Sequence, residues 1–204
     1  MADTYLRQSP LAHLQLIARA EQASATDRVR LGEAAFTSQF VLRGNADDSD
    51  FLAVVEHELG IALPLIPNTV SSGPSDADML RIIWQGPDEW LVVAEESADI
   101  GGILGAIVAG RHAAVSDVGE SRTILNLSGS RARDVLAKGC ALDLHDRVFT
   151  IGQCAQTMLA QAHVILHQTS DAPTYQIYIH RSFAEHLWNW LEDASAEYGM
   201  KIEA

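Results

Sequence analysis

Two histidines near the C-terminal end of the chain stand four residues apart, a spacing that suits a metal site on a helix. On a helix, His163 and His167 would share one face and could bind one ion. The surrounding residues 155–168 instead predict strands, in which residues four apart lie about 13 Å from each other at about 3.3 Å per residue. We therefore expect a structural or surface role for both side chains.

The two cysteines, Cys140 and Cys154, lack the close spacing of a zinc-binding knuckle. They could pair as a disulfide. The first residues show no export signal, however, and this favours two reduced thiols in the cytoplasm. We expect both cysteines to be buried thiols.

Two pairs of carboxylates lie in predicted turns, Asp117 with Glu120 and Asp143 with Asp146. General acid–base chemistry would need such a pair in a pocket, which the sequence does not indicate. Short acidic side chains commonly accept hydrogen bonds from turn backbones, and this is the role that we expect for them.

Glycine and tryptophan residues suggest packing rather than cofactor binding. Gly101, Gly102 and Gly105 lack the strand-to-helix context of a dinucleotide site, so we expect them to permit close helix packing. Four tryptophans are expected to anchor the core, or to place one indole at an interface: Trp84, Trp90, Trp188 and Trp190.

The overall composition limits the possible partners. The 204 residues include 14 basic and 27 acidic ones, which gives a formal net charge of −13. An acidic surface repels phosphate backbones and anionic membranes, so we expect neither nucleic acid nor a membrane as partner. No apolar run reaches transmembrane length.

Hydrophobic periodicity predicts alternating strands and helices in the first half of the chain. The expected elements are a strand over 36–42, a helix capped by Asp48 or Ser49 that runs up to Gly60, a hairpin of strands 79–84 and 89–94, a helix over 98–108 capped by Ser97, and a strand over 112–118.

The second half of the chain shows a similar pattern. The expected elements are a strand over 123–127, a short helix capped by a hydroxyl of Ser128 or Ser130, more strand over 140–145, two strands within 155–168, a strand over 175–179, a helix capped by Ser182 with Trp188 flanking its buried side, and a short or frayed strand at the end.

An apolar segment, residues 1–34, precedes the first obvious strand. Ser9 and Pro10 are typical of a helix start, and residues 23–33 are polar and ambiguous. The segment either packs on its own domain or reaches onto a neighbouring protein. Under the second alternative we expect Leu6, Leu11 and Leu14 to bind the partner.

The chain contains two similar halves, residues 35–118 and 119–204. Gln39–Arg43 aligns with Thr123–Leu127, and Glu89–Ser97 aligns with Thr174–Ser182. Each half reads as strand, helix, two strands, helix and strand. This order predicts an α+β fold with two ferredoxin-like split βαβ plaits, each an antiparallel sheet with helices on one face.

Several strings, in this order, resemble the gamma subunit family of heterotetrameric sarcosine oxidase. They are Leu80–Val92, Ser116–Val118 with Arg122-Thr123, Leu127–Gly129, Asp134–Cys140, Leu142–His145, Gly152–Thr157 and Arg181–Ala184 with Leu187-Trp188. The resemblance extends from about Thr37 to Asp193.

The resemblance implies a fold related to the folate-binding region of the glycine-cleavage aminomethyltransferase. It also implies a complex with alpha, beta and delta chains that oxidatively demethylates sarcosine to glycine, releases hydrogen peroxide and passes the one-carbon unit to tetrahydrofolate. FAD, FMN, NAD and tetrahydrofolate would then sit on the alpha and beta subunits, and none on this chain.

One departure from the aminomethyltransferase pattern favours a non-catalytic role. Those enzymes carry two glycines and an aspartate pair where this chain has Ala160–Leu166, which contains no carboxylate. We therefore expect a subunit that docks on the alpha chain and is not catalytic by itself. The alternative is a free-standing folate-binding protein of aminomethyltransferase type.

Overall fold

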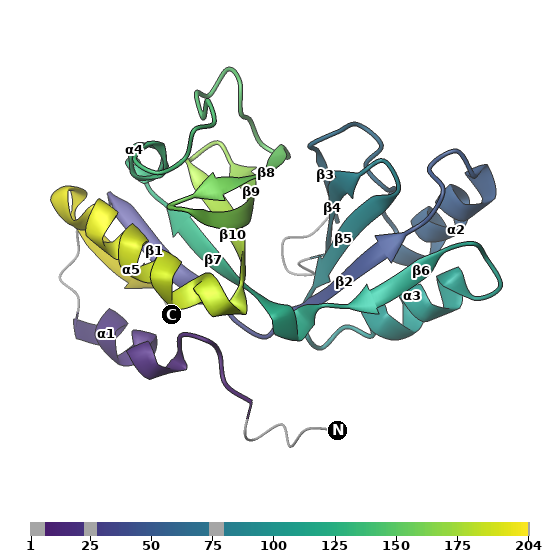
Figure 1. Ribbon diagram of the computed structural model, residues 1–204, viewed down its shortest axis with the longest axis horizontal. Helices are drawn as coiled ribbons and strands as arrows, with labels where there is room; N and C mark the ends of the chain where they lie inside the picture. The colour runs from purple at the N-terminus through teal and green to yellow at the C-terminus, as the bar shows by residue number, and fades with distance from the viewer. Residues whose placement is uncertain (1–6, 23–27, 74–79, 204) are drawn as a thin grey trace. The chain divides into compact units, whose positions relative to one another are not determined.

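The computed structural model describes residues 7–22, 28–73 and 80–203, which divide into two compact units. The first unit comprises residues 36–120 with 152–155, and the second comprises residues up to 35, 121–151 and 156 onward. Both units combine one sheet with helices (Figure 1). None of the described helices is long and apolar enough to cross a lipid bilayer.

The first unit has a five-stranded antiparallel sheet in the order β3-β4-β5-β2-β6. This is the strand order of a ferredoxin-like plait with β3 added at one edge. The elements are β2 (Ser38–Arg43), α2 (Ser49–Leu59), β3 (Val70–Ser72), β4 (Arg81–Gly86), β5 (Glu89–Ala94), α3 (Ile100–Val108) and β6 (Ala114–Asp117).

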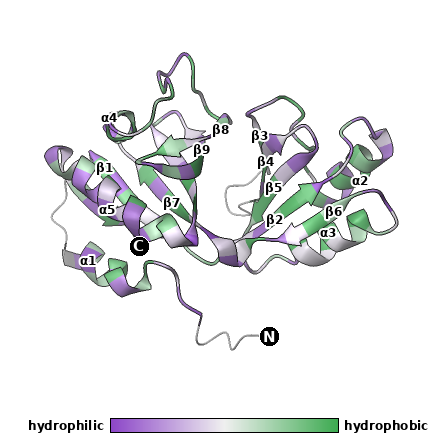
Figure 2. Ribbon diagram, viewed as in Figure 1, coloured by the Kyte–Doolittle hydropathy of each residue, from purple (hydrophilic) through white to green (hydrophobic). Residues whose placement is uncertain are grey.

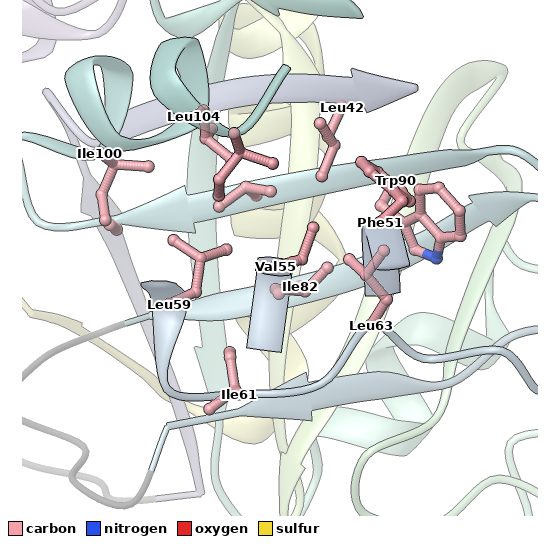
Figure 3. Close-up of a cluster of buried hydrophobic side chains, with 13 residues drawn as sticks. Leu42, Phe51, Val55, Leu59, Ile61, Leu63, Ile82, Trp90, Ile100 and Leu104 are labelled. Atoms are coloured by element: carbon pink, nitrogen blue, oxygen red, sulfur yellow. The ribbon is translucent and has the colours of Figure 1, made fainter. Parts of the chain in front are cut away.

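The core of the first unit lies between its sheet and its two helices (Figure 3). Phe51 and Val55 of α2 and Leu104 of α3 pack against Leu42 and Trp90 of the sheet, and all five are at most 2% exposed. The helices therefore cover one face of the sheet, as the periodicity predicted. The Trp90 indole also donates a 2.9 Å hydrogen bond to the Pro64 carbonyl, which satisfies its buried polar atom.

The ends of these helices follow local chemistry. The Asp48 carboxylate accepts hydrogen bonds from the backbone N–H groups of Asp50 and Phe51, and Gly60 ends α2 in the left-handed region, at φ 71°. The predicted Ser97 cap of α3 is wrong. This helix begins two residues later than expected, and Asp99 accepts the 3.1 Å bond from the Gly102 N–H.

The second unit has a six-stranded sheet in the order β11-β1-β7-β10-β9-β8. β1 and β11 pair in parallel, and β7, β9 and β10 pair antiparallel. The elements are α1 (Leu16–Gln22), β1 (Val29–Ala34), β7 (Arg122–Ser128), α4 (Ala132–Ala137), β8 (Cys154–Leu159), β9 (Ala162–Ser170), β10 (Thr174–His180), α5 (Ala184–Ser195) and β11 (Met200–Glu203). Short 3-10 helices cover Ala12–Leu14, Gly119–Ser121, Arg181–Phe183 and Ala196–Tyr198.

Strand β1 was not predicted. It lies between β7 and β11, and its Val29 and Leu31 side chains are completely buried. Residues 29–34, which were expected to belong to the N-terminal segment, therefore form part of the sheet of the second unit. Only two large apolar residues alternate here, which is too short a pattern to distinguish a strand from a loop.

The two units repeat the same order of elements. β7-α4-β8-β9-β10-α5-β11 corresponds to β2-α2-β3-β4-β5-α3-β6, with β1 inserted beside β7. Leu42 lies opposite Trp90, and Leu127 lies opposite Tyr175. Leu42 therefore aligns with Leu127, so the predicted alignment of Gln39–Arg43 with Thr123–Leu127 is wrong by one residue.

Three further expectations for the second half are wrong. Residues 141–149 form turns rather than a strand, and Cys140 makes a single bridge to Leu159. No side chain caps α4 or α5, so the expected hydroxyl caps do not form. Trp188 is completely buried rather than flanking (0% exposed). Figure 2 shows α5 with mixed hydrophobic and hydrophilic residues, as a helix with one buried face requires.

Candidate functional site

Leu11 and Leu14 do not form an exposed patch. Leu11 is 0% exposed and Leu14 is half-buried, whereas Leu6 lies outside the described residues. The expectation of an exposed Leu11 is therefore wrong. The turn that contains it is held by the Ser9 hydroxyl, which accepts a 2.9 Å hydrogen bond from the Leu11 N–H.

Residues 7–22 pack on their own unit, which was the first of the two alternatives. α1 lies against β11, Arg19 forms an ion pair with Glu192, and His13 lies 3.4 Å from Glu185. Partner binding by this segment remains a prediction. The packing of α1 leaves Ile17 71% exposed, so this side chain is available for contact with another protein.

Large apolar side chains are exposed in both units. Leu65 and Ile66 are 50% and 70% exposed in the loop after α2, between Pro64 and Pro67. Exposed apolar residues that lie together can mark a contact site, and Leu65 and Ile66 are adjacent in the chain. We call the full set the exposed apolar residues: Ile17, Phe36, Leu65, Ile66, Val148, Ile151, Met158 and Phe183.

The two histidines at metal-like spacing lie on strand β9, as predicted. His163 is exposed, whereas His167 is 2% exposed. Across residues 7–22, 28–73 and 80–203, no three His, Cys, Asp or Glu side chains are placed to hold a metal ion.

Both cysteines are buried free thiols, as predicted. The Cys154 thiol lies 3.6 Å from the Thr69 carbonyl and 3.8 Å from the Trp84 carbonyl, to which it can donate. Burial raises the pKa of Cys154 from 9.0 to about 12. A thiolate is the nucleophilic form of cysteine, so Cys154 is poorly suited to nucleophilic chemistry near neutral pH.

The predicted turn carboxylates accept backbone hydrogen bonds. Asp117 accepts a 2.9 Å bond from the Gly119 N–H, and Asp143 accepts a 3.0 Å bond from the His145 N–H. Asp146 contacts the His145 ring at 2.9 Å. These contacts give the carboxylates a structural role, which confirms the interpretation of Asp117 and Asp143 as turn acceptors.

The glycines and tryptophans of interest have packing roles that differ among them. An added Cβ at Gly101 would lie 3.0 Å from the Phe40 ring, so close packing explains this glycine. Gly102 instead donates to the Asp99 cap, and Gly105 has open space around it. Trp90 and Trp188 are completely buried, whereas Trp84 and Trp190 are half-buried.

A hollow of about 510 Å³ in the first unit contains compensated charges. Arg43 forms ion pairs with Asp88 at 2.7 Å and with Glu89 at 3.2 Å. The hydrogen bond from Arg43 lowers the pKa of Asp88, and the same contact raises the pKa of Arg43. Arg111 and His112 also line this hollow, and the Arg111 guanidinium donates a 2.7 Å hydrogen bond to the Ile107 carbonyl.

A second hollow, of about 480 Å³, lies in the second unit over strands β7 to β10, and its polar lining is different. Arg122, His163 and His180 line it together with Gln156 and Thr157. Sequence reasoning missed this set, because its members come from four strands whose register the sequence does not reveal. The sequence shows that Arg122, His163 and His180 are basic, but it does not show that they lie close together.

Comparison with known proteins identifies relatives of the whole chain. Residues 43–197 match the family described as "Sarcosine oxidase, gamma subunit family". Sarcosine oxidase gamma subunits from Corynebacterium sp. strain U-96 and from Arthrobacter sp. are each 34% identical over 196 residues, which is 96% of this chain and 93% of those proteins.

Solved structures also include a chain that resembles this one over almost its whole length. A chain of the heterotetrameric sarcosine oxidase from Corynebacterium sp. U-96, in complex with pyrrole 2-carboxylate, superposes with a TM-score of 0.84 and 34% identity, covering 95% of this chain and 96% of that one. Aminomethyltransferase T of the Bartonella henselae glycine cleavage system has a TM-score of 0.58 and 16% identity, covering 92% of this chain and 50% of that one. The second likeness shows a shared fold only.

Proposed function

Because the chain belongs to the sarcosine oxidase gamma subunit family, we propose that it is the non-catalytic gamma subunit of a heterotetrameric sarcosine oxidase. The observation that carries this proposal is the 34% identity over 96% of the chain. The complex oxidatively demethylates sarcosine to glycine with release of hydrogen peroxide, and transfers the one-carbon unit to tetrahydrofolate. Its flavins, NAD and folate bind to other subunits.

The chemistry of the described residues supports a non-catalytic role. The carboxylates of Asp117 and Asp143 accept turn N–H groups, which fixes them as structural groups. The thiol of Cys154 is buried and its pKa is raised to about 12, so it stays protonated at neutral pH.

The chain docks on the alpha subunit through exposed apolar residues. Ile17 and Ile66 are the two most exposed large apolar side chains, at 71% and 70%. Burial of an isoleucine side chain against a partner is favourable by about 1.5–3 kcal/mol. A minority of contact residues usually carries most of the affinity, so single substitutions can identify them.

Co-expression of the four subunits with an affinity tag on alpha tests this role. We expect Ile17→Ser or Ile66→Ser to lower recovery of this chain with alpha by about fivefold or more, a loss of about 1 kcal/mol. Ala53→Ser is the matched control, because Ala53 is exposed on α2 and offers little apolar surface. Wild-type recovery of both isoleucine variants would remove these side chains from the interface. Failure of the wild-type chain to bind alpha would overturn the proposed function.

A titration with tetrahydrofolate separates this proposal from the free-standing folate-binding alternative. We expect no saturable binding of tetrahydrofolate by the isolated chain, and no turnover of sarcosine. Tight, saturable binding or turnover would favour the aminomethyltransferase-like alternative instead.

A further inference from the structure

We propose that the hollow over β7 to β10 binds a small organic anion, one with one or two carboxylates on a compact apolar body. The proposal is independent of the role as a subunit. It rests on the placement of three basic side chains and on a comparison of the two repeats.

The three basic side chains form a row across three neighbouring strands. Arg122 of β7 lies directly opposite His180 of β10. On the other side of β10, Ile179 pairs with Val164, so the next step along both strands brings His180 beside His163 of β9. Neighbouring strands are about 4.8 Å apart, which places the three Cα atoms within a span of about 10 Å. We call these residues the basic row.

The basic row shares one face of the sheet with the apolar floor of the hollow. Tyr178 and Ile165 are two residues along the strand from His180 and His163, so they point to the same face. Both are buried and both line the hollow. The basic row therefore lies beside an apolar surface. Water screens the interaction between the row and a charged ligand only partly at such a place.

The balance of acidic and basic residues in the hollow differs from that of the chain as a whole. The sequence has almost twice as many acidic residues as basic ones, yet the described lining contains an arginine, two histidines and no carboxylate. Basic side chains gathered in a concave surface favour ligands that carry negative charge.

The first repeat shows that the plait fold does not require this row. Glu95 occupies the position equivalent to His180, by the same alignment that matches Trp90 with Tyr175. Ser38 lies opposite Ala94, so the next step along both strands brings Thr37 beside Glu95. Arg122 lies opposite His180 in the second unit, and Thr37 is therefore the equivalent of Arg122. One repeat thus carries an acidic and a neutral residue where the other carries two basic ones. The basic row is a feature of the second unit, consistent with a ligand there.

The lining also defines the class of ligand. Guanidinium and imidazolium groups donate charge-assisted hydrogen bonds to carboxylates, and the Thr157 hydroxyl and Gln156 amide add neutral donors. Met158, Ile165 and Tyr178 also line the hollow and supply apolar contacts. The volume of about 480 Å³ lies in the range of small-molecule sites, about 300–1,000 Å³. Together these features suit a compact carboxylic acid better than a bare inorganic ion.

Calorimetric titration of the full chain tests the site, with benzoate and succinate as the probes. The measurement is made at constant ionic strength and at about pH 6. We expect saturable binding of benzoate, succinate or both. Benzamide is neutral and has the shape of benzoate, and we expect at least tenfold weaker binding for it.

Substitution of the two exposed histidines provides the decisive comparison. We expect the double variant His163→Gln, His180→Gln to bind the carboxylate at least about tenfold more weakly, because two charge-assisted contacts are lost. Both side chains are exposed, so the variant should keep its fold, which an unchanged circular dichroism spectrum would verify. His57→Gln is the matched control, because His57 is exposed on α2 in the first unit.

Three results would overturn the proposal. They are no saturable binding of either carboxylate, equal affinity in the double variant and the wild type, and tighter binding of inorganic phosphate than of both carboxylates. Because the titration uses no partner subunit, each of these results bears on the hollow and leaves the proposed function untouched.

Discussion

The thiol of Cys154 links a single residue to the stability of the first unit at high pH. Burial raises its pKa from 9.0 to about 12. Between these values the unfolded chain has lost the thiol proton while the folded chain still holds it, so the free energy of unfolding decreases as the pH rises. Below about pH 9 the thiol is protonated in both states and its contribution is constant. The expected decrease is at most about 1.4 kcal/mol per pH unit.

Urea unfolding of the wild type and of Cys154→Ala at about pH 8 and about pH 10.5 measures this effect. We expect the wild type to lose more stability between the two pH values than the variant does. The comparison between variants matters, because burial also raises the pKa of Tyr175, which contributes to the same decrease in both proteins. Cys140→Ala is the control for loss of a buried thiol. Equal losses in wild type and Cys154→Ala would contradict the prediction.

Residue types alone predicted some side-chain roles and not others. The Asp48 cap and the turn contacts of Asp117 and Asp143 depend only on near neighbours in the chain. The turn contacts were predicted correctly, and Asp48 was one of the two predicted caps. The burial of Leu11 depends on distant parts of the second unit, and it was not predicted. The basic row needs the register between β7, β9 and β10, which no local pattern contains.

Two glycines in different elements are expected to respond in opposite ways to alanine. A Cβ at Gly32 would lie 2.6 Å from the Glu203 carbonyl, where β1 pairs with β11. Gly105 lies in α3, and a Cβ there meets no atom within 4 Å. We expect Gly32→Ala to destabilise the protein by about 1–3 kcal/mol through strain, and Gly105→Ala to stabilise it by about 0.5–1 kcal/mol through helix propensity.

Chemical denaturation of both variants checks this pair, with each protein serving as the control for the other. A neutral Gly32→Ala would mean that β11 can shift away without loss, and would argue against a tight β1–β11 pairing. A destabilising Gly105→Ala would contradict the open space around that position.

Elements with a long regular pattern were predicted well, and elements held by distant partners were not. The helix over α2 and the strands β5, β7 and β10 match their predicted ranges within two residues, because each has a clear period of its own. β1 is short, and its partners lie near residues 125 and 201, so its identity depends on tertiary pairing. The expected strand over 140–145 failed for the converse reason. Leu142 and Leu144 alternate, but pairing with the edge strand β8 stops at the single bridge between Cys140 and Leu159.

At the scale of the whole molecule, the two repeats are completed in different ways. The first unit is built almost entirely from the continuous segment 36–120, whereas the second unit joins β1 near the N-terminus to β11 at the C-terminus. The duplication itself was predicted, because the order of elements survives in the sequence. The insertion of β1 was not, because it interrupts the repeat with a segment from outside it.

Separate cores predict that damage to one unit stays within it. Leu31 of β1 and Leu42 of β2 are both 0% exposed leucines on strands, one in each unit. Replacing either by alanine should cost about 2–5 kcal/mol by leaving a cavity. Backbone amides exchange with solvent through local opening, so the loss of protection should map to the unit that carries the cavity.

Hydrogen–deuterium exchange with mass spectrometry measures this directly. We expect Leu31→Ala to speed exchange in β1, β7 and β11 and to leave β4 and β5 protected, and Leu42→Ala to show the reverse. The two variants control for each other, because the residue type, the burial and the substitution are the same. If either variant raised exchange equally in both sheets, the chain would unfold as one cooperative body, and the two cores could not be treated as independent.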